Sequence, residues 1–84
     1  MAFHRVILAE YVFDSPQDEG EAARADGKLG DCLEVRDARR VRTYWSADRS
    51  RRISVFEAVD AETVRHAHRS AGVPFRAIWP ADES

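Results

Sequence analysis

The sequence predicts an α+β domain in which strand, helix, strand, strand, helix and strand follow one another. Three observations support this fold class. β-Branched and aromatic residues gather in four short segments, apolar residues recur at helical spacing in two longer ones, and turn or capping residues separate the segments. This order is that of the split βαβ, or ferredoxin-like, fold (βαββαβ). It predicts a four-stranded antiparallel sheet with both helices on one face.

Length and composition agree with a single domain, residues 1–84. Apolar residues make up 44% and charged residues 33% of the chain, which is typical of a globular domain. The formal net charge of −2 gives no general attraction to nucleic acid or to anionic lipid. The single cysteine, Cys32, cannot form an internal disulfide, and no run is apolar for long enough to span a membrane. We therefore expect a cytoplasmic location, with neither nucleic acid nor membrane as a partner.

The segment from Phe3 to Phe13 is the first predicted strand, because it is rich in β-branched and aromatic residues and precedes turn-forming residues. Apolar side chains occur at both odd and even positions, which favours a central strand that is covered on both faces. Glu10 interrupts the even positions, which are otherwise apolar: Val6, Leu8 and Val12.

Ser15 followed by Pro16 predicts the start of the first helix, since serine accepts a hydrogen bond from a free backbone N–H and proline at the first helical position has none to lose. An apolar stripe at helical spacing follows: Ala22, Ala25, Leu29 and Leu33. Gly27 and Gly30 oppose the helix, each costing roughly 1 kcal/mol relative to alanine. We expect a helix that is weak or broken between these two glycines.

Two predicted strands, Arg40–Ser46 and Arg51–Val59, flank the polar residues 47–50 and indicate a hairpin. With a loop of that length, alternation of side chains assigns residues to two faces. One face carries Arg42, Tyr44, Ile53, Val55 and Glu57. The other carries Val41, Thr43, Trp45, Ser54 and Phe56.

The second helix has the clearest boundaries in the sequence. Asp60 is a good N-cap, Gly72 suits the left-handed position after the last turn, and Pro74 prevents continuation. Its predicted inner face consists of Val64, Ala67, His68 and Ala71. Residues 75–79 form the last predicted strand.

Helices on one face of the sheet leave the other face uncovered. The strands nevertheless carry apolar residues at positions of both parities. A homodimer in which sheet packs against sheet would bury this second apolar face, so we expect a dimer.

Several short motifs support a family resemblance. They are Leu8-Ala9-Glu10, Tyr44-Trp45-Ser46-Ala47-Asp48, Val55-Phe56-Glu57-Ala58, Val64-Arg65 and Ala71-Gly72-Val73-Pro74. In these motifs the chain resembles a small bacterial nickel-binding domain family, whose function is otherwise unknown. The resemblance implies a ferredoxin-like domain that dimerises and is associated with nickel. Where family members often carry two histidines, this chain has Arg42 and Ala67.

His68 is the leading candidate for a metal ligand. A nickel or zinc site needs several imidazole, thiolate or carboxylate donors that converge on one point. His68 lies on the inner face of the second helix, where the alternative interpretation is a hydrogen-bonded core histidine.

Glu10, Arg42 and Tyr44 are the candidate ligand-binding residues. A carboxylate within an apolar strand is either paired or perturbed in its pKa, and both conditions are common at functional sites. Arg42 and Tyr44 share a face and offer a guanidinium and a phenol to an anionic or aromatic ligand. The alternatives are an arginine-paired carboxylate at Glu10, and an edge-strand charge beside a core aromatic at Arg42 and Tyr44.

Two functional hypotheses follow, and no residue is assigned a catalytic role by a motif. The first is a dimeric binding domain with a sheet-side cavity for a small ligand or a divalent transition metal such as nickel. The alternative is a cofactor-independent enzyme of the dimeric α+β barrel type, with Glu10 or His68 as acid or base on a hydrophobic substrate. A purely structural or regulatory partner is a third hypothesis.

Overall fold

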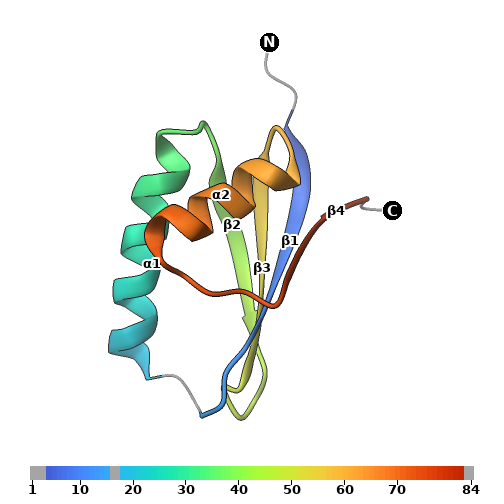
Figure 1. Cartoon of the computed structure of the whole chain (residues 1–84). Coiled ribbons are helices and arrows are strands. Elements are labelled where there is room, and N and C mark those ends of the chain that lie inside the picture. The colour runs from blue at the N-terminus through green and yellow to red at the C-terminus, as the bar shows by residue number, and fades with distance from the viewer. Residues whose placement is uncertain (1–3, 16–17, 83–84) are drawn as a thin grey trace.

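The chain forms four strands and two helices in the predicted order, and the computed structural model describes residues 4–15 and 18–82. The elements are β1 (Arg5–Val12), α1 (Glu19–Glu34), β2 (Arg39–Trp45), β3 (Arg51–Ala58), α2 (Ala61–Ala71) and β4 (Ala77–Ala81). Both helices lie on the same side of the sheet (Figure 1). The predicted ferredoxin-like βαββαβ fold is thereby confirmed.

The sheet has the strand order β2-β3-β1-β4, and every neighbouring pair is antiparallel. β1 is a central strand, as its apolar residues of both parities predicted, and β2 and β4 are the edges. Leu8 pairs with Val55 on one side and with Trp79 on the other, and Val55 pairs in turn with Arg42. One row of side chains therefore crosses all four strands on the face away from the helices.

The hydrophobic core fills the layer between the sheet and the two helices. The sheet contributes Ile7, Ala9, Tyr11, Phe56, Ala58 and Ile78, and the helices contribute Leu29, Leu33, Ala61, Val64 and Ala67. Fully burying one large apolar side chain stabilises the fold by roughly 1.5–3 kcal/mol. The buried residues of β1 are the odd-numbered ones, so the even-numbered ones lie on the uncovered face.

Helix α1 differs from its prediction in two ways. It runs unbroken from Glu19 to Glu34, so the predicted break near Gly27 and Gly30 is wrong. The buried side chains of Leu29 and Leu33 hold this stretch against the sheet, which offsets the cost of the glycines.

The predicted helix start at Ser15 and Pro16 is also wrong, and Pro16 itself lies outside the described residues. Asp18 is the N-cap, and its Oδ1 accepts a hydrogen bond of 2.7 Å from the backbone N–H of Glu21. Asp18 is followed by two glutamates in the first turn, where negative charge is favoured by the helix dipole.

The second half of the chain follows its predictions more closely. Arg42 and Tyr44 share a face with Val55 and Ile53, although a register shift between Arg40 and Arg42 displaces the residue between them. The N-cap at Asp60 is confirmed, and Gly72 adopts the left-handed conformation with φ of 69°.

Strand β4 begins at Ala77, two residues later than expected, and includes Pro80. Proline is tolerated there because β4 is an edge strand. Among the described residues, no helix is long and apolar enough to cross a membrane.

Candidate functional site

The uncovered face of the sheet is largely apolar. Its side chains come from all four strands and include Val6, Leu8, Tyr44, Ile53, Val55 and Trp79. Most of these side chains are half-buried by their neighbours, and Tyr44 is 57% exposed. Figure 1 shows neither helix on this side of the sheet. The face is therefore an apolar surface that the described chain leaves open.

A hollow of about 380 Å³ lies on this face and brings two of the predicted ligand-binding residues together. Arg42 and Tyr44 both line it, and an Nη1–H of Arg42 lies 3.5 Å from the Tyr44 hydroxyl. Apolar side chains form much of its wall, and Glu57 and Asp82 add carboxylates. The full lining is Val6, Leu8, Val41, Arg42, Tyr44, Val55, Glu57, Ala81 and Asp82.

Glu10 lies on the same face but outside this hollow. Its carboxylate accepts a hydrogen bond of 2.9 Å from Arg51 and lies 3.6 Å from Nε of Arg76. Only 16% of the Glu10 side chain is exposed, so two arginines shield one partly buried carboxylate. This arrangement matches the arginine-paired alternative, and a role for Glu10 in ligand binding stays a prediction.

His68 lies on the opposite side of the sheet and is fully buried in the core. Its Nδ1 lies 2.7 Å from the backbone carbonyl of Val64, and its Nε2 lies 2.5 Å from the hydroxyl of Tyr11. Since the carbonyl can only accept, Nδ1 carries the proton and Nε2 accepts from the Tyr11 hydroxyl. Both ring nitrogens are thus engaged inside the chain, as the core-histidine alternative requires.

Burial sets the protonation of this pair. Desolvation lowers the pKa of His68, and although the hydrogen bond to Val64 acts in the opposite direction, the charge of Arg52 lowers it further. Desolvation also raises the pKa of Tyr11 above its usual value of 10.0. The pair is therefore a neutral imidazole and a neutral phenol at pH 7.

Glu10 and His68 do not form a catalytic pair. Glu10 is on an even position of β1 and faces away from the helices, whereas His68 is on the inner face of α2. The sheet separates them. A hypothesis that combines both groups as acid and base on one substrate has no support from this geometry.

Arg52 is a buried cation that is not among the site residues predicted from the sequence. Only 4% of it is exposed, and its guanidinium donates a hydrogen bond of 2.9 Å to Asp26 of α1. Its Cζ also lies 4.5 Å from the ring centroid of Tyr11 and 5.3 Å from that of Trp45. Within the described residues, its Nε is buried without a hydrogen-bond partner. The sequence could have indicated the burial of Arg52, because strand alternation places it on the same face of β3 as Ser54 and Phe56.

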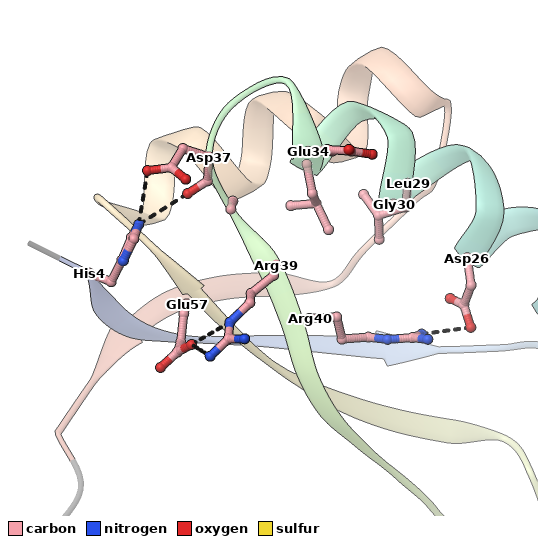
Figure 2. A pocket seen from close by; sticks show the side chains of 11 residues that line it. His4, Asp26, Leu29, Gly30, Glu34, Asp37, Arg39, Arg40 and Glu57 are labelled. Atoms are coloured by element: carbon pink, nitrogen blue, oxygen red, sulfur yellow. Dashed lines mark hydrogen bonds and ion pairs between the residues drawn. The ribbon is translucent and has the colours of Figure 1, made fainter. Parts of the chain in front are cut away.

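A further cleft, of about 400 Å³, lies between α1 and β2 (Figure 2). Three pairs of its charged side chains lie close together. Arg39 donates a hydrogen bond of 2.7 Å to Glu57, Arg40 lies 2.7 Å from Asp26, and His4 lies 3.3 Å from the carboxylate of Asp37. The Arg40–Asp26 pair joins β2 to α1, and the Arg39–Glu57 pair joins β2 to β3, which are structural roles.

Metal donors do not converge in the described part of the chain. Within residues 4–15 and 18–82, no group of three or more histidine, cysteine, aspartate or glutamate side chains could hold a metal ion. A role for His68 as a metal ligand stays a prediction, and it would require Tyr11 to release Nε2.

Comparisons with known proteins place the chain in a family. Residues 9–80 match the sequence profile of the family described as "Nickel responsive protein SCO4226-like". The chain belongs to the SCO4226-like family. Its fold is similar to the crystal structure of SCO4226 from Streptomyces coelicolor A3(2), with a TM-score of 0.82 and 13% sequence identity over 94% of this chain and 98% of that chain. A search of curated protein sequences gives no match.

Membership in this family confirms the resemblance that the motifs suggested. At 13% identity, the likeness to SCO4226 supports the fold alone. The name of the family connects it with nickel, and Arg42 and Ala67 remain at the positions where the motif comparison expected histidine.

Proposed function

We propose that this SCO4226-like protein is a dimeric binding domain in which two copies pack their open sheet faces together and enclose a small ligand. The observation that carries the proposal is the apolar row on that face. Leu8 and Val55 lie at its centre, and Trp79 lies at one end. Contiguous apolar patches on a protein surface are typical of interaction sites and ligand-binding grooves.

The hollow beside Arg42 and Tyr44 is the proposed ligand cavity. Apolar walls with a few polar groups are typical of small-molecule sites, and a second copy would close the open side of the hollow. Arg42 offers a cation and Tyr44 an aromatic ring, while Glu57 and Asp82 are the acidic groups at the rim. The ligand class that fits best is therefore a small, partly apolar molecule with at least one polar group.

Nickel is the second candidate ligand, because the family is described as nickel responsive. The described residues of one chain do not supply a converging set of donors. For nickel we therefore propose a site with donors from two copies. Calorimetric titration with Ni(II), Zn(II) and Cu(II) tests this point, since an absence of binding tighter than millimolar removes metal from the proposal.

The dimer is tested by Leu8→Glu, which places a carboxylate at the centre of the apolar row. We expect the wild-type protein to have the mass of a dimer in native mass spectrometry or light scattering, and Leu8→Glu to have the mass of a monomer with unchanged circular dichroism. Burying an unpaired charge in an interface is strongly unfavourable. A monomeric wild type would contradict the proposal.

Val35→Lys is the matched control. Val35 follows α1, is 79% exposed and lies outside the proposed interface, so this variant should remain dimeric. If Val35→Lys and Leu8→Glu change the mass equally, the open sheet face is not the interface.

A further inference from the structure

A third cavity lies on the helix side of the sheet, among β1, α1 and the segment that follows α2. It has a volume of about 510 Å³, within the range of small-molecule sites. Its apolar lining comes from both helices, β1 and the segment after α2: Tyr11, Phe13, Ala22, Ala25, Ala71, Val73 and Pro74. Small side chains on α1 leave the space open, since alanines stand where larger residues would fill it.

The charged residues that line this cavity are all cationic. They are Arg24, Lys28 and Arg52, and its described lining contains no carboxylate. Neither Arg24 nor Lys28 forms a salt bridge with another described residue, whereas Arg52 is paired with Asp26, whose carboxylate also lies 2.7 Å from Arg40. The cleft in Figure 2 differs sharply, because there each arginine is paired with a carboxylate.

Arg52 is already engaged within the protein. It is 96% buried, its guanidinium donates a hydrogen bond to Asp26, and its Cζ lies 4.5 Å from the ring centroid of Tyr11. The cationic charge that the cavity offers to a ligand therefore belongs to Arg24 and Lys28, and a carboxylate is a group that such cations attract.

We propose that the cavity between α1 and the segment after α2 binds a small organic anion that has one carboxylate and an apolar body. Arg24 and Lys28 attract the carboxylate electrostatically, and the apolar body lies against Phe13, Ala25 and Val73. This site is separate from the hollow beside Arg42 and Tyr44. The two lie on opposite faces of the sheet.

Titration with octanoate, followed by ¹H–¹⁵N correlation spectra, tests the proposal. We expect saturable shifts that centre on Ala22, Ala25 and residues 71–73, and weaker binding as the salt concentration rises. Octanol, which has the same apolar body without the charge, should bind at least about tenfold more weakly. Equal binding of octanoate and octanol, or shifts centred on Arg42 and Tyr44, would overturn the proposal.

Variants separate the two polar contributions. Lys28→Gln should weaken octanoate binding by about two- to fivefold, as an exposed charge does, while the control Arg5→Gln removes a charge elsewhere and should leave binding unchanged. Arg24→Gln should weaken octanoate binding to a similar extent, and unchanged binding by a variant that carries both Lys28→Gln and Arg24→Gln would overturn the proposal.

Ala25→Phe fills the cavity from α1 and gives a test that does not depend on the charges of Arg24 and Lys28. It should abolish octanoate binding, and unchanged binding by the folded variant would overturn the proposal. The Leu8→Glu variant should bind octanoate like the wild type, because its change is on the other face. The outcome for this cavity is thus independent of the outcome for the proposed dimer.

Discussion

The Tyr11 hydroxyl and Nε2 of His68 lie 2.5 Å apart inside the layer between the sheet and the helices. This contact joins β1 to α2 across 57 residues of sequence. It also fixes the tautomer of His68, because Nδ1 donates to the Val64 carbonyl and leaves Nε2 as the acceptor. A buried imidazole that is held neutral in this way has a measurable effect on stability.

The first prediction is a loss of stability in mild acid that depends on His68. Burial lowers the pKa of His68 below 6.5 in the folded protein. As the pH falls through about 6.5, the unfolded chain takes up a proton that the folded chain does not, so the free energy of unfolding decreases. The decrease is at most about 1.4 kcal/mol per pH unit, and it ends at the folded-state pKa. Urea unfolding between about pH 7.5 and about pH 5.5 measures it.

His68→Gln should lose this part of the pH dependence. His66→Gln is the matched control, since His66 is exposed on the same helix and the variant should keep the dependence seen in the wild type. If all three proteins give the same slope, the buried imidazole does not control acid stability.

The second prediction concerns the other partner in the contact. Tyr11→Phe removes the hydroxyl and leaves a buried ring nitrogen of His68 without a donor, so we expect a loss of about 1–3 kcal/mol in the free energy of unfolding. Adding His68→Leu to Tyr11→Phe removes the orphaned nitrogen, and the double variant should be less destabilised than the sum of the single ones. Strict additivity would show that the two groups are not coupled.

The sequence predicted this core arrangement in part. The stripe at helical period placed His68 inside α2, whereas apolar residues at both parities of β1 left open which face of that strand is packed against the helices. Neither pattern could pair them, because a contact between residues far apart in sequence depends on strand order and helix position. The same limit explains why Asp26 was not connected with Arg52, and why Glu10 and His68 were considered together although the sheet separates them.

Local competition explains the errors in α1. Ser15 with Pro16 is a sound capping signal, yet Asp18 satisfies the backbone N–H of Glu21 at 2.7 Å and starts the helix later. Intrinsic propensity predicted a break at the glycines, whereas burial of Leu29 and Leu33 keeps the helix intact. Tertiary packing can override intrinsic helix propensity, and the sequence of one segment does not show which residues it will pack against.

The third prediction compares a buried and an exposed ion pair. A double-mutant cycle on Arg52→Met and Asp26→Asn should give a coupling energy above about 1 kcal/mol, because Arg52 is 4% exposed and leaves a partly buried carboxylate when removed. The same cycle on Arg39→Met and Glu57→Gln should give less than about 1 kcal/mol, since these side chains are 75% and 37% exposed. Equal coupling in the two cycles would contradict a structural role for the buried pair.

The fourth prediction uses the glycines, whose backbone conformations differ. Gly27 and Gly30 are exposed within α1, and a Cβ added at either position meets no atom within 4 Å. Gly27→Ala and Gly30→Ala should each raise the free energy of unfolding by roughly 0.5–1 kcal/mol, because alanine favours the helix. Thermal or urea unfolding measures the change.

Gly72→Ala should have the opposite effect on stability. Gly72 ends α2 with φ of 69°, in the left-handed region where a Cβ costs roughly 1–2 kcal/mol. The added Cβ would meet no atom within 4 Å there either, so sterics with neighbouring side chains cannot explain a difference between the positions. A stabilised Gly72→Ala, or destabilised Gly27→Ala and Gly30→Ala variants, would contradict the helix boundaries described above.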